Sequence, residues 1–307
     1  MTDTLYLGDY TYSSWSLRGW LLMVRFGLPF DPVRVDFSEG PVADQLTVIP
    51  PARTVPCLVT ADGAVIWDSL AIAEELASRH PDAGLWPLDP IARATARSIA
   101  AEMHASFGAL RSDCPMNLQT GYADVAPSDA VLADVARIET LWAHARTRFG
   151  DGGPWLFGAY TAADAFYAPV AARIAGYGLP VSSTAQDYVA AHLADPAFRR
   201  WRAMGIAKAE HLARYDRPFR QIGWPGPTPL PARAIETGTP ENDLCPYSGK
   251  PITHLMNIDG RVFGFCNAFC RDKTVADPLA WPAFAALFDG KGRSTPDRTP
   301  SRIPDRS

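Results

Sequence analysis

Two serines near the start of the chain stand where a short apolar strand gives way to an apolar helix. Ser13 and Ser14 precede a helical pattern that continues to Phe26, so a serine occupies the N-cap of that helix. Its oxygen can accept backbone N–H groups that the first turn leaves unpaired, and the partial positive charge at this end also favours an anion. The serine pair could therefore cap the helix, or one hydroxyl could donate to a bound thiolate.

Two further stretches could hold a peptide-like ligand. Val55-Pro56 lies between an irregular loop and a strand, and a cis bond there would turn the Val55 N–H and C=O outward, free to pair with a ligand backbone. Asp68-Ser69 opens a helix, where the hydroxyl and the backbone N–H groups can hold a carboxylate and Asp68 can accept from an ammonium group. Each stretch also has an ordinary explanation, as a strand-start proline and a helix cap.

Cysteines form a third candidate site, late in the chain. Of five cysteines, Cys245, Cys266 and Cys270 cluster, which favours free thiols or a metal over a disulfide framework. Thiolates at a turn and at positions i and i+4 of a helix start can converge on tetrahedral zinc. The set is one ligand short unless His254 or another group completes it. The alternative is a scaffold held only by its Phe and Trp core.

Composition limits the kinds of partner that these groups can serve. The 307 residues suggest about two domains, and the 47% that are hydrophobic can bury substantial cores. A net charge of −4 provides no broad basic field, so we expect neither nucleic acid nor a membrane as a partner. The start lacks the basic region of a signal peptide, and no apolar run is long enough to span a bilayer. We therefore expect a cytoplasmic protein.

The elements that must position the first two groups form a small α/β domain over residues 1–82. The periodicity predicts a strand at 4–8, a helix at 14–27, a strand at 30–35, a strand after Pro56 and a helix at 70–79. Asp62-Gly63 is a strong hairpin signal between the strand after Pro56 and a short partner strand. The sheet is thus expected to be mixed.

The remainder of the chain divides into four segments. Residues 88–215 are predicted to be an all-helical domain, with helices at about 91–112, 128–149, 161–176, 184–193 and 196–214. Dense prolines at 216–242 predict an extended linker. A compact module is expected at 243–288, followed by a disordered tail at 289–307.

The order of these motifs resembles the glutathione transferase family over residues 4 to about 214. Ser13 aligns with the serine that donates to the glutathione sulfur in the zeta and related bacterial classes, and Ser14 is the alternative if the register is shifted by one. Thr54-Val55-Pro56 is similar to the Val-Pro motif, whose cis proline leaves the valine to pair with the cysteinyl backbone. Asp68-Ser69 begins a motif that binds the γ-glutamyl end.

The resemblance carries further expectations about fold and activity. It implies a thioredoxin-like domain followed by an all-helical domain whose buried capping box is Thr161-x-x-Asp164. It also implies a homodimer that uses glutathione as co-substrate against a small electrophile, as a transferase or isomerase with a role in detoxification. Trp15 departs from the zeta pattern, which commonly has cysteine there, and this puts maleylacetoacetate as substrate in doubt. A glutathione-binding protein without turnover and a metal- or redox-responsive protein are the alternatives.

The second substrate would bind against the helical domain. In the predicted helix 98–112, His104, Phe107 and Arg111 share a face at i, i+3 and i+7, where an aromatic ring and a cation could hold an anionic or conjugated molecule. Contacts between the two domains are the alternative role for His104 and Arg111.

The C-terminal module resembles small metal-binding domains of the YHS/TRASH type, which makes it zinc-finger-like. Ser248 replaces the second cysteine of that pattern. The resemblance therefore implies zinc bound by Cys245, Cys266 and Cys270, with His254 as a candidate fourth ligand.

Overall fold

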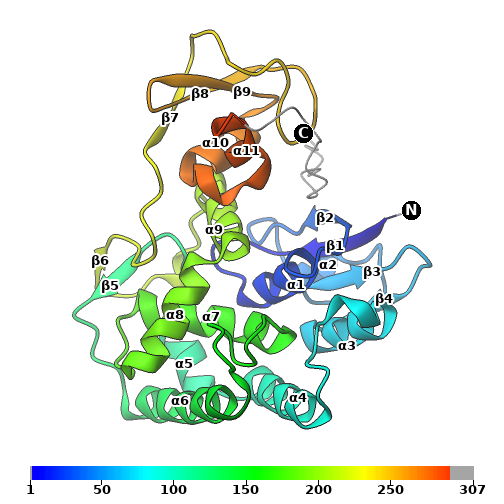
Figure 1. Cartoon of the computed structure of the whole chain (residues 1–307), viewed down its shortest axis with the longest axis vertical. Coiled ribbons are helices and arrows are strands. Elements are labelled where there is room, and N and C mark those ends of the chain that lie inside the picture. The colour runs from blue at the N-terminus through cyan, green and yellow to red at the C-terminus, as the bar shows by residue number, and fades with distance from the viewer. Residues whose placement is uncertain (1, 291–307) are drawn as a thin grey trace.

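The computed structural model describes residues 2–290, arranged in three successive parts (Figure 1). The first part contains a four-stranded sheet in the order β2-β1-β3-β4, with β1 parallel to β2 and antiparallel to β3. Its elements are β1 (Asp3–Leu7), α1 (Ser14–Val24), β2 (Phe30–Arg34), α2 (Val42–Gln45), β3 (Cys57–Val59), β4 (Val65–Ile66) and α3 (Ser69–Arg79). The predicted βαβ opening and hairpin are therefore present, in a thioredoxin-like arrangement. The predicted tail lies outside the described residues from position 291 onward.

The second part contains the predicted helices, two of them shortened. They are α4 (Pro90–Ala105), α5 (Gly108–Asp113), α6 (Asp129–Phe149), α7 (Ala162–Gly176), α8 (Ser183–Ala194) and α9 (Pro196–Lys208). The helix expected at 91–112 breaks into α4 and α5, because Phe107 between them adopts a left-handed φ of 63°. α9 ends early for the same reason, since Ala209 has φ of 50°. Among the described residues, no helix combines the length and apolar character required to cross a membrane.

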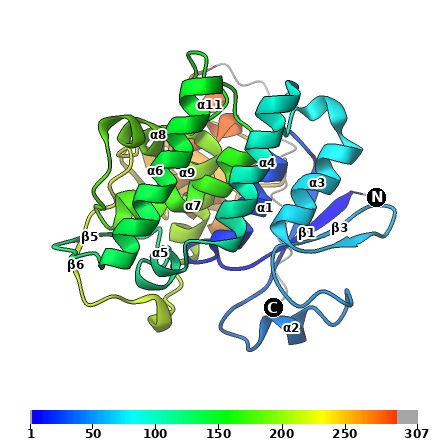
Figure 2. The same ribbon diagram turned by 90° about the horizontal axis from the view of Figure 1, so that it is seen from below.

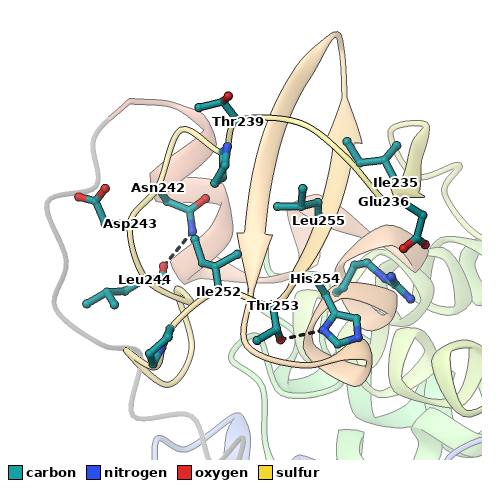
Figure 3. Close-up of a pocket in the computed structure, with 13 residues that line it drawn as sticks. Ile235, Glu236, Thr239, Asn242, Asp243, Leu244, Ile252, Thr253, His254 and Leu255 are labelled. Atoms are coloured by element: carbon teal, nitrogen blue, oxygen red, sulfur yellow. Dashed lines mark hydrogen bonds between the residues drawn. The ribbon is translucent and has the colours of Figure 1, made fainter.

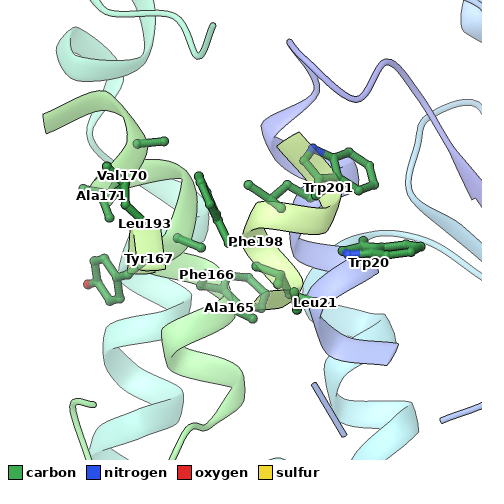
Figure 4. Packing of buried hydrophobic residues seen from close by; sticks show 14 of the residues in the cluster. Trp20, Leu21, Ala165, Phe166, Tyr167, Val170, Ala171, Leu193, Phe198 and Trp201 are labelled. Atoms are coloured by element: carbon green, nitrogen blue, oxygen red, sulfur yellow. The ribbon is translucent and has the colours of Figure 1, made fainter. Parts of the chain in front are cut away.

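Helix α1 is apolar on nearly every side because it packs between the first and second parts. β1 and α3 contact it from the first part, and α7 and α9 contact it from the second (Figure 2). The ring centroid of Trp20 of α1 lies 5.7 Å from that of Trp201 of α9 (Figure 4). It lies at the same distance from that of Phe30 of β2. Burying one large apolar side chain contributes about 1.5–3 kcal/mol. The position of α1 is therefore held by both parts.

A buried carboxylate organises the start of α7. Asp164 accepts the backbone N–H of Thr161 at 2.8 Å and that of Leu156 at 3.1 Å. The hydroxyls of Thr161 and Tyr188 also donate to it, at 2.9 and 2.8 Å. The predicted capping box is confirmed. Asp164 in addition ties α7 to the preceding loop and, through Tyr188, to α8.

The third part is a three-stranded antiparallel sheet, in the order β7-β8-β9, covered by short helices. It consists of β7 (Ala232–Ile235), β8 (His254–Ile258), β9 (Arg261–Phe265), α10 (Ala268–Ala276), the 3-10 helix η3 (Pro278–Ala280) and α11 (Pro282–Phe288). The segment 216–242, predicted as a linker, differs from that expectation. Its strand β6 (Arg220–Ile222) pairs with β5 (Gly121–Ala123) of the second part, and β7 pairs with β8.

The third part also packs directly on the second, through α10 against α9. Arg199 of α9 forms a two-pronged ion pair with Asp277, at 2.8 and 2.7 Å. The Lys208 ammonium lies 5.2 Å from the centre of the Phe269 ring. An extended proline-rich linker predicts a module with little packing against its neighbours. The structure differs, because η3 and α10 supply a docking face on α9 that sequence periodicity does not reveal.

The capping carboxylate makes a direct prediction about stability. Asp164→Ala should lower the free energy of unfolding by at least about 3 kcal/mol, because several buried donors lose their partner at about 1–3 kcal/mol each. Chemical denaturation measures it. Ser182→Ala is the matched control, since Ser182 caps α8 with one bond of 3.4 Å to the Ala185 N–H and should cost about 1 kcal/mol. Equal losses in the two variants would contradict the role given to Asp164.

Candidate active site

A cavity of about 540 Å³ lies between the thioredoxin-like part and the helical part. It collects the predicted residues Ser13, Ser14, Val55, Pro56 and Asp68 on one side. Thr54 also belongs to this wall. The other lining residues are Tyr12, Trp15, Phe37, Val42, Arg53, Arg111, Pro115, Arg173 and Tyr215. Motifs that are up to 55 residues apart in the sequence, from 13 to 68, therefore surround one space.

Ser13 is the N-cap of α1, so the ordinary role expected for a serine here is present. Its Oγ accepts the backbone N–H of Ser16 at 3.3 Å and donates to the Ser16 Oγ at 2.8 Å. The Ser16 Oγ in turn accepts the N–H of Gly8 at 2.9 Å. Sequence reasoning missed Ser16, although its i+3 spacing from the cap was a usable signal. The cap and its hydrogen-bonded partner form a chain of two hydroxyls, of which Ser13 lines the cavity and Ser16 is fully buried.

The loop before Ser13 is held by a buried acid that sequence reasoning also missed. The Asp9 carboxylate accepts the backbone N–H groups of Thr11 at 2.7 Å and Tyr12 at 2.9 Å. The Ser13 N–H donates to the Asp9 carbonyl at 3.0 Å. The Tyr12 ring stacks on Tyr215 with centroids 4.6 Å apart. These contacts set the direction in which the loop delivers Ser13.

The Val55–Pro56 bond is cis, as the resemblance implies. Pro56 packs on α1 at Gly19, where an added Cβ would lie 2.7 Å from the Pro56 Cβ. A side chain at position 19 would displace this turn. Glycine is therefore needed at this position for the Val-Pro turn to approach the middle of α1 closely.

The start of α3 has one satisfied and one unsatisfied polar group. Asp68 caps the helix and accepts the N–H groups of Leu70 at 3.0 Å and Ala71 at 3.4 Å. The Ser69 Oγ is fully buried and has no hydrogen-bond partner among the described residues. Such a group is costly to leave unpaired. An oxygen of a bound carboxylate at this helix end would satisfy it.

Arginines dominate the charge on the helical side of the cavity. Arg173 donates to the carbonyls of Cys114 at 2.9 Å and Pro169 at 3.1 Å, and to the Ser14 Oγ at 3.4 Å. Burial, and then the nearby charge of Arg111, lower the pKa of Arg173 to about 10. Burial also lowers the pKa of Arg111. With Arg53, these cations outnumber Asp68, the acid among the lining residues, so the cavity favours an anion.

The proposed shared face of His104, Phe107 and Arg111 is wrong, because the helix that would carry it breaks at Phe107. Phe107 is buried in the core, and of the three only Arg111 lines the cavity. The His104 Nε2 lies 3.1 Å from the Asp68 carboxylate, and its ring meets Trp15 edge-on at 5.1 Å. Burial lowers the pKa of His104. The interdomain role considered for His104 agrees with these contacts.

The three late cysteines converge in the third part. Their Sγ atoms all lie within 4.8 Å of one another, and those of Cys266 and Cys270 are 3.9 Å apart. The Ser248 Oγ donates to the Cys266 Sγ at 3.2 Å. His254 is not part of this group, since its Nδ1 instead lies 2.9 Å from the Thr253 Oγ1. Because His254 begins β8, the strand places it away from the sulfurs.

A second cavity, of about 900 Å³, lies on the third part (Figure 3). Its wall includes His254 and Arg271, and Asn242, whose amide donates to the Leu244 carbonyl at 2.8 Å. None of the clustered cysteines and none of the residues predicted to bind glutathione line it. It is larger than the cavity beside Ser13, but the polar groups suited to thiol chemistry gather at the smaller one.

Comparisons with known proteins find relatives of the first part of the chain. Residues 12–79 match the family model described as the glutathione S-transferase N-terminal domain. A probable maleylacetoacetate isomerase from Caenorhabditis elegans is 40% identical over 94 residues, which are 31% of this chain and 44% of that protein. The chain thus spans less than half the length of the curated relative it matches.

Solved structures extend the likeness to the helical part. A glutathione transferase homologue from Burkholderia gl BGR1, solved with bound glutathione, is 24% identical with a TM-score of 0.51, covering 68% of this chain and all of that one. A glutathione S-transferase from Rhodospirillum rubrum F11 is 21% identical with a TM-score of 0.50, covering 71% of this chain and 96% of that one. At these identities the likeness shows the fold, a glutathione transferase fold, and nothing more.

An acidic pair next to the serine loop gives the site a pH-sensitive neighbour. Glu210, just after α9, forms ion pairs with Arg34, which also lies 3.6 Å from Asp9. The Glu210 carbonyl accepts from Gln119 at 2.9 Å. Burial and a hydrogen bond shared with Asp9 raise the pKa of Glu210 to about 7. The folded protein therefore holds the proton of the Glu210 carboxyl more tightly than the unfolded chain does.

We predict a corresponding pH dependence of stability. For an acid with a raised folded pKa, the stabilising contribution is present below the unfolded value and is lost as pH rises through the folded one, here from about 4.5 to about 7. Glu210→Gln mimics the protonated side chain, so its melting temperature relative to wild type should rise between pH 5 and pH 8. Glu241→Gln, at an exposed acid on the third part, is the control and should show no such rise. If the melting temperatures of wild type and Glu210→Gln change in parallel with pH, Glu210 does not have a raised pKa in the folded protein.

Proposed function

We propose that this protein is a glutathione-dependent transferase or isomerase in which Ser13 stabilises the glutathione thiolate. One observation carries the proposal: Ser13, the cis Val55–Pro56 turn and the start of α3 border a single cavity of about 540 Å³. A tripeptide in that cavity can place its sulfur at the N-terminus of α1 and its cysteinyl backbone beside Val55. Its γ-glutamyl carboxylate can then bind at the start of α3, where the Ser69 hydroxyl has no hydrogen-bond partner among the described residues.

The two-hydroxyl chain supports a specific activation mechanism. A serine hydroxyl has one proton and two acceptor sites, and the Ser16 N–H occupies one acceptor of Ser13. When Ser13 turns its proton toward the thiolate, Ser16 can donate its own proton to the Ser13 Oγ while still accepting from Gly8. Such aligned hydrogen bonds strengthen one another. Together with the helix dipole they lower the thiol pKa from about 8.5, each unit being worth about 1.4 kcal/mol.

The second substrate is proposed to be a small electrophile that carries negative charge. Arg111 and Arg173 line the cavity beside Ser14, and a Ser14 hydroxyl held at 3.4 Å by Arg173 faces the same side. These groups can hold a carboxylate and place an adjacent unsaturated carbon near the thiolate. The curated relative is a probable maleylacetoacetate isomerase, and isomerisation of a related acid is one candidate reaction. Trp15 occupies the position where the zeta class commonly has cysteine, and this difference argues against maleylacetoacetate itself as the substrate.

On the family resemblance we further propose a homodimer and a role in detoxification. The convergence of the late cysteines supports a zinc-binding module, and the sequence features described above support a cytoplasmic location. A protein that binds glutathione without turnover is the competing function. Steady-state turnover with glutathione and an electrophile distinguishes it from the enzyme.

The serine assignment predicts a kinetic defect. Ser13→Ala should reduce kcat/KM by roughly 10- to 1000-fold, about 1.4–4 kcal/mol, and raise the pKa of bound glutathione. Ser16→Ala should give a smaller loss of the same kind, and Ser14→Ala should leave the thiol pKa unchanged. The thiolate absorbance of bound glutathione against pH reports this directly.

The control for lost helix capping is Ser128→Ala. Ser128 caps α6 with a bond of 3.3 Å to the Val131 N–H, the same length as the bond from the Ser16 N–H to Ser13. It should lose comparable stability without changing the thiol pKa. If Ser14→Ala proves more damaging than Ser13→Ala, the residue that activates the thiol is Ser14.

The proposed contact between the glutathione carboxylate and Ser69, at the start of α3, predicts a binding defect. Ser69→Ala should weaken glutathione binding by about tenfold while kcat changes little, because the carboxylate contact exists in the ground and transition states alike. Isothermal titration and the KM for glutathione measure it. Ser78→Ala is the control, since within residues 2–290 the Ser78 hydroxyl on the same helix bonds only to the Glu74 carbonyl. A loss confined to kcat would exclude this role.

A further inference from the structure

We propose that Cys245, Cys266 and Cys270 form a three-thiolate site for a thiophilic divalent ion such as zinc or cadmium, whose fourth corner, beside Ser248, is open to an exogenous ligand. The inference rests on the metal-binding function proposed for the module and adds the coordination number and the open position. It does not depend on glutathione chemistry.

The distances between the sulfurs fit one ion. A metal–sulfur bond of about 2.3 Å and a tetrahedral angle place two sulfurs about 3.8 Å apart. Cys266 and Cys270 are 3.9 Å apart, and all three sulfurs lie within 4.8 Å of one another. A disulfide requires a separation of about 2.05 Å, and all three cysteines are free thiols. Small side-chain rotations would bring the third sulfur to bonding distance.

The backbone around the sulfurs is tied down on each side. The Cys245 turn is closed by its N–H to the Lys250 carbonyl at 3.0 Å. The Thr253 hydroxyl donates to the Cys266 carbonyl at 2.8 Å, and the Asn267 side chain caps α10 by accepting the Cys270 N–H at 2.7 Å. The three ligands therefore come from a turn, a strand end and a helix start that are held in position. This is the preorganisation that a metal site needs.

A buried cation lies close to the site. Lys273, one turn after Cys270 on α10, is 2% exposed. Its ammonium lies 4.0 Å from the centre of the Tyr247 ring and 4.1 Å from that of Trp281. Three thiolates around a divalent ion leave a net charge of −1, and a nearby ammonium offsets it.

The open corner is inferred from Ser248. Its Oγ lies 3.2 Å from the Cys266 Sγ, and it stands where the resembling domains have their second cysteine, which would be the fourth ligand here. Cys245 and Cys270 are buried, whereas Cys266 is partly exposed and Ser248 is exposed, so the ion would be reached from this side. A neutral hydroxyl is a weak ligand for a thiophilic ion. Water or a small thiol can therefore complete the coordination sphere, and the bound ion can exchange.

The test uses the full, reduced chain, stripped of metal, titrated with cadmium in the absence of glutathione. Thiolate-to-cadmium charge-transfer absorbance should saturate at one ion per chain. Cys266→Ser should weaken binding by more than about 100-fold, beyond the loss expected from an outer-shell change. Ser248→Ala should stay within about threefold of wild type. Ser248→Cys should tighten binding by at least about tenfold and raise the saturating absorbance by about one third, because a fourth thiolate is added.

Cys114→Ala is the matched control, since Cys114 is buried in the helical part and should leave the titration unchanged. Absence of binding, or a thiol count in denaturant below five after mild air exposure, would overturn the metal site in favour of a scaffold or a disulfide. A severe loss in Ser248→Ala, or no gain in Ser248→Cys, would overturn the open corner. Ser13→Ala should titrate as wild type does, so failure of the thiol mechanism and failure of the metal site are separate results.

Discussion

The burial of α1 between two parts of the chain is the constraint on which the rest of the structure depends. Ser13 is its N-cap, so any shift of the helix moves the hydroxyl that is proposed to stabilise the glutathione thiolate. Two close approaches hold it: Gly19 lies under Pro56, and Gly205 of α9 lies against Thr11, where an added Cβ would be 2.7 Å from the Thr11 Oγ1. A larger side chain at either position would separate elements that together form the cavity. Packing density in such interiors leaves little room for adjustment.

Buried positive charge is the main electrostatic feature of the same region. Arg18 is 1% exposed and lies over the rings of Trp15, at 4.4 Å, and Phe166, at 5.0 Å. Burial, and then the charges of Arg111 and Arg173, lower its pKa well below the usual value. Placing cations where they are poorly solvated costs stability. The compensating gain would be a positive potential, fixed before any ligand arrives, that stabilises a thiolate and an anionic substrate.

The third part is joined to this arrangement through α9. The same helix carries Arg199, which pairs with Asp277 of the module, and Gly205, which contacts the loop before Ser13. Asp277 is buried and Arg199 partly buried, so removing one partner of this pair would leave a poorly solvated charge unpaired and destabilise the docking. The module therefore belongs mechanically to the helical part, even though its cysteines lie on elements of their own. A small module of this size gains stability from such docking as well as from any bound ion.

Local signals in the sequence determined most of the elements and much of the site. The serine N-cap, the Asp68 cap and the Thr161–Asp164 capping box depend on neighbouring residues, and each was predictable from residue types and spacing. The cis Val-Pro turn followed instead from the family resemblance. The three cysteines were also identifiable, because their types limit their chemistry. Only the tertiary structure decided which groups meet. Phe107 takes a left-handed conformation where periodicity predicts a continuous helix, β8 removes His254 from the sulfurs, and α10 docks on α9. Each depends on contacts between residues far apart in the chain, whose energies outweigh local propensity and leave no periodic trace in the sequence.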